Sequence, residues 1–108
     1  GKVDGISVRA PVATGSLTDL VVQLGRETTA DEVQAAYRDA AAGPLEGILQ
    51  FSEDPLVSTD IIGDPHSSIF DAEQTMVLEG NMVKIFAWYD NEWGYSNRCV
   101  ELAAKVLP

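Results

Sequence analysis

A β-hairpin is predicted by the stretch TMVLEGNMVKIFAWY, residues 75–89. Gly80-Asn81 is a two-residue turn signal, and the segments on either side of it, Thr75–Glu79 and Met82–Tyr89, have strand-like composition. Successive side chains of a strand face opposite surfaces. The second arm has apolar side chains on both faces: Val83, Ile85 and Ala87 on one, Met82, Phe86 and Trp88 on the other. We therefore expect it to be a well-buried strand.

Further strand patterns lie upstream of the hairpin. Gly5–Val12 and Leu17–Leu24 alternate apolar and polar residues around a Gly-containing turn. Shorter strand-like pieces, bounded by turns that contain Asp-Pro pairs, follow at Ile48–Phe51, Val57–Ile62 and Ser68–Phe70. Strands thus account for most of the predicted structure.

Two helices are predicted between and after these strands. Thr29 and Glu32 fit a capping box, and an apolar stripe follows at helical spacing: Val33, Ala36, Tyr37 and Ala40. Gly43-Pro44 ends this helix, with the glycine as a left-handed cap. The second helix begins after Asp90 and runs to about Leu107. The fold class is therefore α+β, with a largely antiparallel or mixed sheet, one covering helix and a C-terminal helix.

Composition limits the functions that the chain can have. Its 108 residues suffice for one domain but not for a complete two-domain enzyme, and no apolar run is long enough to span a membrane. Seven Lys and Arg are scattered among 17 Asp and Glu, which disfavours nucleic-acid and anionic-membrane binding. A single cysteine excludes an internal disulfide and a multi-cysteine metal site. The start, which lacks Met, suggests part of a longer protein.

Few residues have a pattern that points to chemistry. Cys99 lies well inside the predicted C-terminal helix and is expected to be a small buried or half-buried residue. His66 is expected to be a polar loop residue, because neighbouring serines do not make a catalytic triad. Arg9 is a cation inside the predicted strand Gly5–Val12, on the face opposite Val8 and Ala10. It either binds an anion or forms a structural ion pair or an exposed edge.

The densest feature is WYDNEWGYS, residues 88–96, in which four of nine residues are aromatic. Asp90 is a good helix N-cap, and Gly94 in the first turn is costly unless another group approaches closely. Asn91 offers a donor and an acceptor, the pair that reads another carboxamide. The stretch is either a small-molecule contact point or aromatic packing that anchors the terminal helix.

The ten residues YDNEWGYSNR, 89–98, resemble the C-terminal signature of the glyceraldehyde-3-phosphate dehydrogenase family. The segment RAPVATGS, residues 9–16, is similar to the family's Arg-Val-Pro segment, with Ala10 and Ala13 as departures. GPLEGIL (43–49) and DIIGDPHSSIFD (60–71) fit in the same order. The resemblance covers essentially the whole chain.

This resemblance implies the oxidation of glyceraldehyde 3-phosphate, with NAD or NADP and inorganic phosphate, to 1,3-bisphosphoglycerate. It implies that Arg9 holds the substrate phosphate, that Asn91 hydrogen-bonds the nicotinamide carboxamide, and that Tyr95 lies nearby in a supporting role. It also implies a cytoplasmic homotetramer when the protein is complete. No metal site is implied.

The family's nucleophilic cysteine, catalytic histidine and dinucleotide-binding fold would lie upstream of Gly1, so no catalytic residue is expected in this chain. Residues 1–88 are expected to be the later part of the catalytic domain, and residues 89–108 a helix that returns to the absent dinucleotide-binding domain. Alone, the chain is predicted to be inactive. Two alternatives remain: a fragment of an erythrose-4-phosphate dehydrogenase, and a non-catalytic binding or assembly module.

Overall fold

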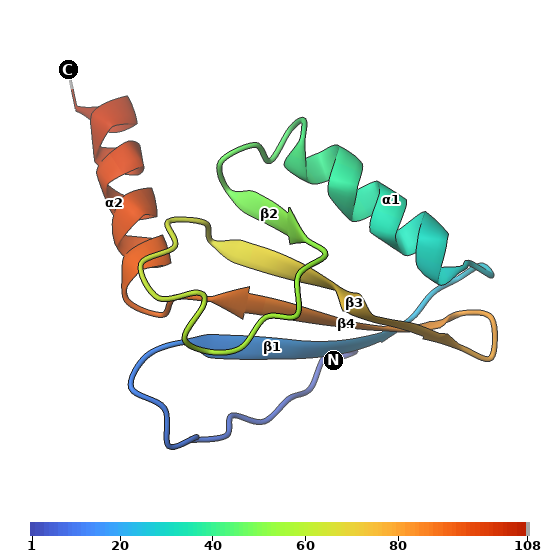
Figure 1. Ribbon diagram of the computed structural model, residues 1–108. Helices are drawn as coiled ribbons and strands as arrows, with labels where there is room; N and C mark the ends of the chain where they lie inside the picture. Colours follow the sequence, from blue (N-terminus) through green and yellow to red (C-terminus); the bar gives the residue numbers. More distant parts are fainter. Residues whose placement is uncertain (108) are drawn as a thin grey trace.

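A computed structural model describes residues 1–107 (Figure 1). The elements in chain order are β1 Ser16–Gln23, α1 Ala30–Ala41, β2 Leu49–Ser52, β3 Ser68–Leu78, β4 Met82–Tyr89 and α2 Trp93–Val106. The strands form one sheet in the order β1-β4-β3-β2, in which only the β2–β3 pair is parallel. The predicted α+β class with a mixed sheet is confirmed, while Pro108 of the predicted terminal helix segment lies outside the described residues.

The predicted hairpin forms the centre of the sheet. β4 pairs with β3 on one side and with β1 on the other. Its Val83 and Ile85 are buried toward α1, and Phe86 and Trp88 are half-buried on the opposite face. The loop has three residues, 79–81, rather than two, because Leu78 pairs with Met82. Glu79 and Gly80 both have positive φ, the condition of a type I′ turn that matches the twist of the strands.

The hydrophobic core lies between α1 and one face of the sheet. Phe70 is fully buried, and its ring stacks on Tyr37 of α1, with 4.1 Å between ring centroids. Phe51 of β2 stacks on the ring of Phe70 as well, with 5.6 Å between ring centroids. The aromatic contact explains why the α1 stripe faces this part of the sheet, since aromatic rings carry most of the apolar area that a small core can bury.

The ends of α1 agree with the sequence only in part. The Thr29 hydroxyl accepts a hydrogen bond from the Glu32 amide, as predicted for the cap. The left-handed cap at Gly43 was a wrong prediction, because the helix ends at Ala41 with right-handed Ala42 as its cap. The amides of Gly43 and Leu45 both bond the Ala40 carbonyl, so the chain leaves the helix through further turns.

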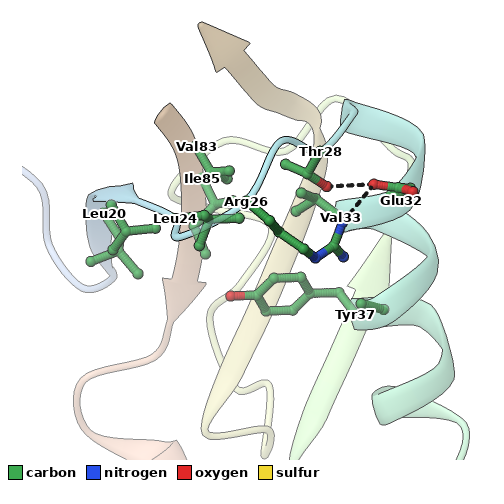
Figure 2. Close-up of a pocket in the computed structure, with 11 residues that line it drawn as sticks. Leu20, Leu24, Arg26, Thr28, Glu32, Val33, Tyr37, Val83 and Ile85 are labelled. Atoms are coloured by element: carbon green, nitrogen blue, oxygen red, sulfur yellow. Dashed lines mark hydrogen bonds and ion pairs between the residues drawn. The ribbon is translucent and has the colours of Figure 1, made fainter. Parts of the chain in front are cut away.

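α1 covers only part of the sheet face and leaves an apolar hollow of about 230 Å³ above β1 and β4 (Figure 2). Leu20, Val22 and Leu24 form one wall, and Val33 and Tyr37 of α1 form another. Arg26 and Glu32 form an ion pair of 3.4 Å beside it. Most of the lining is aliphatic, and its charged groups, Arg26 and Glu32, are already paired with each other.

Two predicted strands are absent. Gly5–Val12 is an exposed segment without strand pairing, part of the loop that precedes β1 (Figure 1), because an alternating pattern becomes a strand only where a neighbouring backbone pairs with it. Val57–Ile62 forms turns, in which the Asp60 carboxylate accepts from the Val57 amide. Within this second segment Ile61 is buried, which accounts for its apolar pattern. The third short piece, Ser68–Phe70, is the start of the much longer β3.

α2 projects from the end of the sheet (Figure 1). Gly94, in its first turn, is its only buried residue, and the apolar side chains of Val100, Leu102 and Val106 are all more than 60% exposed. Among residues 1–107, no helix combines the length and the apolar character needed to cross a membrane.

Candidate functional site

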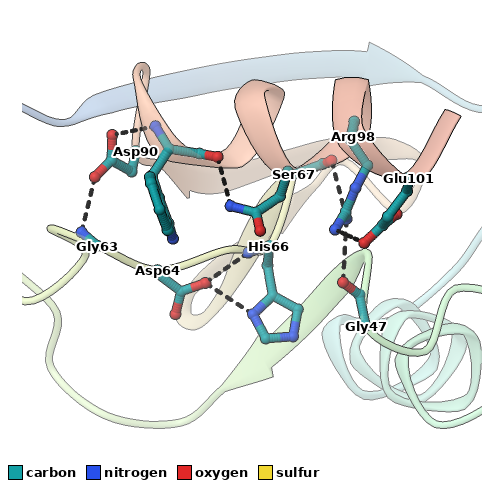
Figure 3. A network of polar contacts seen from close by, with 10 residues as sticks. Gly47, Gly63, Asp64, His66, Ser67, Asp90, Arg98 and Glu101 are labelled. Carbon is teal, nitrogen blue, oxygen red and sulfur yellow. Dashed lines mark hydrogen bonds and ion pairs between the residues drawn. The ribbon is translucent and has the colours of Figure 1, made fainter. Parts of the chain in front are cut away.

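The junction between β4 and α2 is organised by the carboxylate of Asp90. The residue is only 4% exposed. Its Oδ2 accepts from the Gly63 amide at 2.8 Å (Figure 3). Its Oδ1 accepts from the Glu92 and Trp93 amides at 2.8 and 2.9 Å. The predicted N-cap position is wrong by two residues, since α2 begins at Trp93 with Glu92 as its N-cap. The Asp90 carboxylate still accepts from the amides at the start of the helix and also ties the loop before β3 to it.

These hydrogen bonds make Asp90 a pH-sensitive part of the fold. Its pKa is lowered from the usual 3.8, first by the bond from the Gly63 amide and further by those from Trp93 and Glu92, against the opposing effect of burial. A depressed folded-state pKa adds stability that is present above the unfolded pKa and is lost as the pH falls through the folded value.

We expect Asp90→Asn to be less stable than the unaltered chain at pH 6, with a difference that shrinks as the pH falls below 3.8. Urea unfolding at pH 6, 4 and 3 measures this. Other acid-sensitive groups, Glu32 among them, are common to both proteins and cancel in the difference. A difference that stays constant across this range would show that the ionised carboxylate contributes nothing.

A second close contact joins α2 to the same loop. A methyl group at Gly94 would lie 2.7 Å from the His66 carbonyl oxygen, so the close approach expected from the sequence is present. His66 lies in the loop, where the Asp64 carboxylate accepts from its amide and is 2.7 Å from its Nδ1. The loop and the helix thus pack backbone against backbone.

Asn91 lies at the surface of this junction. Its Oδ1 accepts from the Gly15 amide at 2.9 Å, a contact between residues 76 positions apart. Gly15 has a φ of 107°, and a side chain there would meet the Ser58 carbonyl at 3.1 Å. The Asn91 amide keeps its Nδ2 donors and the second lone pair of Oδ1 for a ligand.

Tyr95 and Cys99 lie one turn apart on α2. Tyr95 is 74% exposed, and the neighbouring Cys99 side chain raises the pKa of its hydroxyl. Cys99 is exposed, so its predicted burial is wrong. The reason is that the outer side of α2 packs against no other element within residues 1–107.

Arg98 is a structural anchor that the sequence analysis missed. Its guanidinium is mostly buried, donates to the Gly47 carbonyl at 3.1 Å and pairs with Glu101 at 2.6 Å (Figure 3). The side chain therefore fixes the middle of α2 to the turn before β2. Its place at the end of the aromatic-rich block was the available signal.

The polar groups of the junction border a cavity of about 180 Å³. Its lining combines hydroxyl, carboxamide and guanidinium groups: Ser67, Tyr89, Asp90, Asn91, Gly94, Tyr95 and Arg98. Two predicted site residues, Asn91 and Tyr95, are thus brought together. Arg9 is not part of the lining, and within residues 1–107 its exposed side chain has no hydrogen bond or ion pair. The same residues contain no cluster of metal-binding side chains.

Comparison of the sequence with known proteins identifies the family to which the chain belongs. The family model for the C-terminal domain of glyceraldehyde 3-phosphate dehydrogenase matches residues 1–91. The chain belongs to the glyceraldehyde-3-phosphate dehydrogenase family, as the resemblance predicted.

Individual relatives agree with the family model. The chain is 62% identical, over 106 residues and 98% of its length, to glyceraldehyde-3-phosphate dehydrogenase 2 of Streptomyces avermitilis, of which this covers 32%. It is 62% identical to the enzyme of Streptomyces coelicolor and 60% identical to glyceraldehyde-3-phosphate dehydrogenase 1 of Bacillus cereus, with the same shares of both chains. The chain thus spans about a third of the length of these relatives.

Proposed function

We propose that the chain serves as the C-terminal portion of a phosphorylating glyceraldehyde-3-phosphate dehydrogenase. The complete enzyme would oxidise glyceraldehyde 3-phosphate, with NAD or NADP and inorganic phosphate, to 1,3-bisphosphoglycerate. The observation that carries the proposal is the anchored carboxamide of Asn91 beside a polar cavity at the start of α2. The extent of identity with named dehydrogenases supports the same assignment.

The residues at the junction fit a nicotinamide. A carboxamide needs both a donor and an acceptor, and Asn91 retains both after bonding Gly15. Tyr95 lies one turn further along α2, in the lining of the same cavity, and supplies a hydroxyl and an aromatic face. The dinucleotide supplies the hydride acceptor when it is bound. The role of this chain is to hold the nicotinamide ring in one orientation.

Arg9 is assigned to the substrate phosphate. Its guanidinium has no anionic partner among residues 1–107, and a guanidinium fork matches the oxygens of a phosphate. Gly15, six residues on, is bonded to Asn91, so the segment that carries Arg9 leads directly to the cofactor-binding residue. Substrate and cofactor would then be held by neighbouring parts of the chain.

The nucleophile and the general base are assigned to the upstream portion of the enzyme, together with the dinucleotide-binding domain. Residues 1–88 belong to the catalytic domain in this proposal, and residues 89–108 lead back toward that upstream portion. The exposed apolar side chains of α2, Val100, Leu102 and Val106, support such a docking. The complete enzyme is proposed to be a cytoplasmic homotetramer.

The decisive experiment follows the absorbance of the reduced dinucleotide at 340 nm. The complete polypeptide should reduce NAD or NADP with glyceraldehyde 3-phosphate and phosphate, and the 108-residue chain should not. A preference for erythrose 4-phosphate would instead identify the related dehydrogenase. If the complete polypeptide shows no reduction with either aldehyde, the enzymatic proposal fails in favour of a binding or assembly module.

We expect Asn91→Ala in the complete enzyme to weaken dinucleotide binding about tenfold, because one hydrogen-bonded carboxamide pair is lost. Isothermal titration with the dinucleotide measures the effect. Asn97→Ala is the matched control, since Asn97 lies six residues further on, in α2, and its side chain only donates to the Trp93 carbonyl. Unchanged affinity in Asn91→Ala would remove this residue from the site.

A further inference from the structure

We propose that Asp90 is a positioning residue for the cofactor, which fixes the Asn91 carboxamide through the backbone that its carboxylate holds. The inference rests on the proposed function, because it concerns how that site is kept in shape. The Asp90 carboxylate itself is not assigned to the ligand, since both of its oxygens already accept hydrogen bonds from backbone amides.

Hydrogen bonds hold Asn91 at both its backbone and its side chain. Asp90 precedes it, and the two amides that follow it, Glu92 and Trp93, both donate to the Asp90 Oδ1. The backbone of Asn91 is therefore enclosed in a hydrogen-bonded turn. Its side chain is held at the far end by the Gly15 amide. The orientation of the carboxamide depends on both attachments, because either one alone leaves the amide free to rotate.

The Gly63 amide holds the second oxygen of the Asp90 carboxylate. This amide belongs to a loop 27 residues away, and its bond to Oδ2 prevents the carboxylate from turning with the helix end. Asp90 is thus fixed relative to the body of the domain rather than only to α2. A carboxylate is the suitable group here, since all three partners are donors and it presents only acceptors.

α2 is also held in place by contacts that do not involve Asp90, so a change at Asp90 can move Asn91 without undocking the helix. Two other contacts hold α2 in place: the packing of Gly94 on the His66 carbonyl and the bond from Arg98 to the Gly47 carbonyl. With these intact, Asp90→Asn leaves the helix docked but places an amide NH₂ against at least one donor N–H. The turn must then shift, and the carboxamide of Asn91 shifts with it.

The test uses the complete enzyme and two probes, the intact dinucleotide and adenosine diphosphate ribose, which lacks the nicotinamide. The ratio of their dissociation constants reports the contribution of the nicotinamide end alone. We expect Asp90→Asn to reduce this preference for the dinucleotide about tenfold and to leave the affinity for adenosine diphosphate ribose unchanged. In an Asn91→Ala background, Asp90→Asn should produce no further reduction of the ratio.

Two variants serve as controls. Glu92→Gln removes a negative charge close to Asp90, and the Glu92 side chain forms no hydrogen bond within residues 1–107. Thr29→Ala removes the cap of α1, far from the junction, and costs a comparable amount of stability. Both should retain the ratio of the unaltered enzyme. Should Asp90→Asn fail to fold, Asp90→Ser replaces it, because serine still caps a helix but cannot reach Gly63 as well.

The outcomes distinguish the two proposals. If the unaltered enzyme binds both probes equally, the proposed function of Asn91 fails. If Asn91→Ala loses the preference for the dinucleotide while the folded Asp90 variant keeps it within about twofold, positioning by Asp90 is overturned. A parallel loss of affinity for both probes would equally overturn it, because that result indicates a general structural defect.

Discussion

Gly94→Ala should lower the free energy of unfolding by about 3 kcal/mol, the upper end of the usual cost of overpacking. The added methyl group would lie 2.7 Å from the His66 carbonyl oxygen, which is part of the backbone and cannot turn aside as a side chain can. Relief requires α2 to move away from the loop, and the bonds of the Asp90 carboxylate resist that movement. The normal gain from placing alanine in a helix, about 1 kcal/mol, is therefore outweighed.

Urea unfolding of the chain measures this loss, with a stabilising osmolyte added so that both proteins show a complete transition. Gly25→Ala is the matched control: it has an ordinary negative φ, and a methyl group there would meet nothing within 4 Å. That variant should be unchanged or slightly more stable, because alanine restricts the unfolded chain. Equal stability of Gly94→Ala and the unaltered chain would show that α2 is not held against the loop.

Arg9→Leu in the complete enzyme should raise the KM for glyceraldehyde 3-phosphate about 100-fold, because truncating one partner of a charged, hydrogen-bonded pair costs far more than losing a surface charge. The KM for the dinucleotide should change little. The KM of Arg9→Lys for the aldehyde should lie between those of the unaltered enzyme and Arg9→Leu, since lysine retains the charge but not the planar fork of donors. Initial-rate kinetics with varied aldehyde and saturating cofactor measure the effect.

Arg26→Leu is the matched control for this substitution. Arg26 is also exposed, but it pairs with Glu32 beside the apolar hollow of α1. Its removal should leave the KM for the aldehyde unchanged. If Arg9→Leu keeps the KM of the unaltered enzyme, then the guanidinium is only an exposed surface group, the alternative that the sequence left open.

The sequence predicted correctly those elements that are set by residues close to one another in the chain. The α1 cap at Thr29 is a contact across three residues, and the hairpin at residues 79–81 depends on a short glycine turn. Both can be recognised because helix capping and turn chemistry depend on neighbours in the chain. The family resemblance was also visible in the sequence, because the block at residues 89–98 is long and rich in aromatic residues.

Patterns failed where a distant partner was needed. Gly5–Val12 alternates like a strand, but the described chain provides no backbone to pair with it. Cys99 was expected to be buried from its apolar neighbours, yet the outer side of α2 is exposed along its length. Apolar residues at a regular spacing indicate that one face of an element can be buried, but they do not indicate which surface covers it.

The sequence was therefore sufficient for the α+β class, for a helix that follows Asp90 and for the family, because each depends on residues close together in the chain. The tertiary structure alone showed that Asp90 also binds Gly63, that Asn91 holds Gly15 and that Gly94 packs on His66. These contacts join residues 27 or more positions apart. No local period encodes such pairs, because they form only when the sheet brings the ends of distant segments to the same edge.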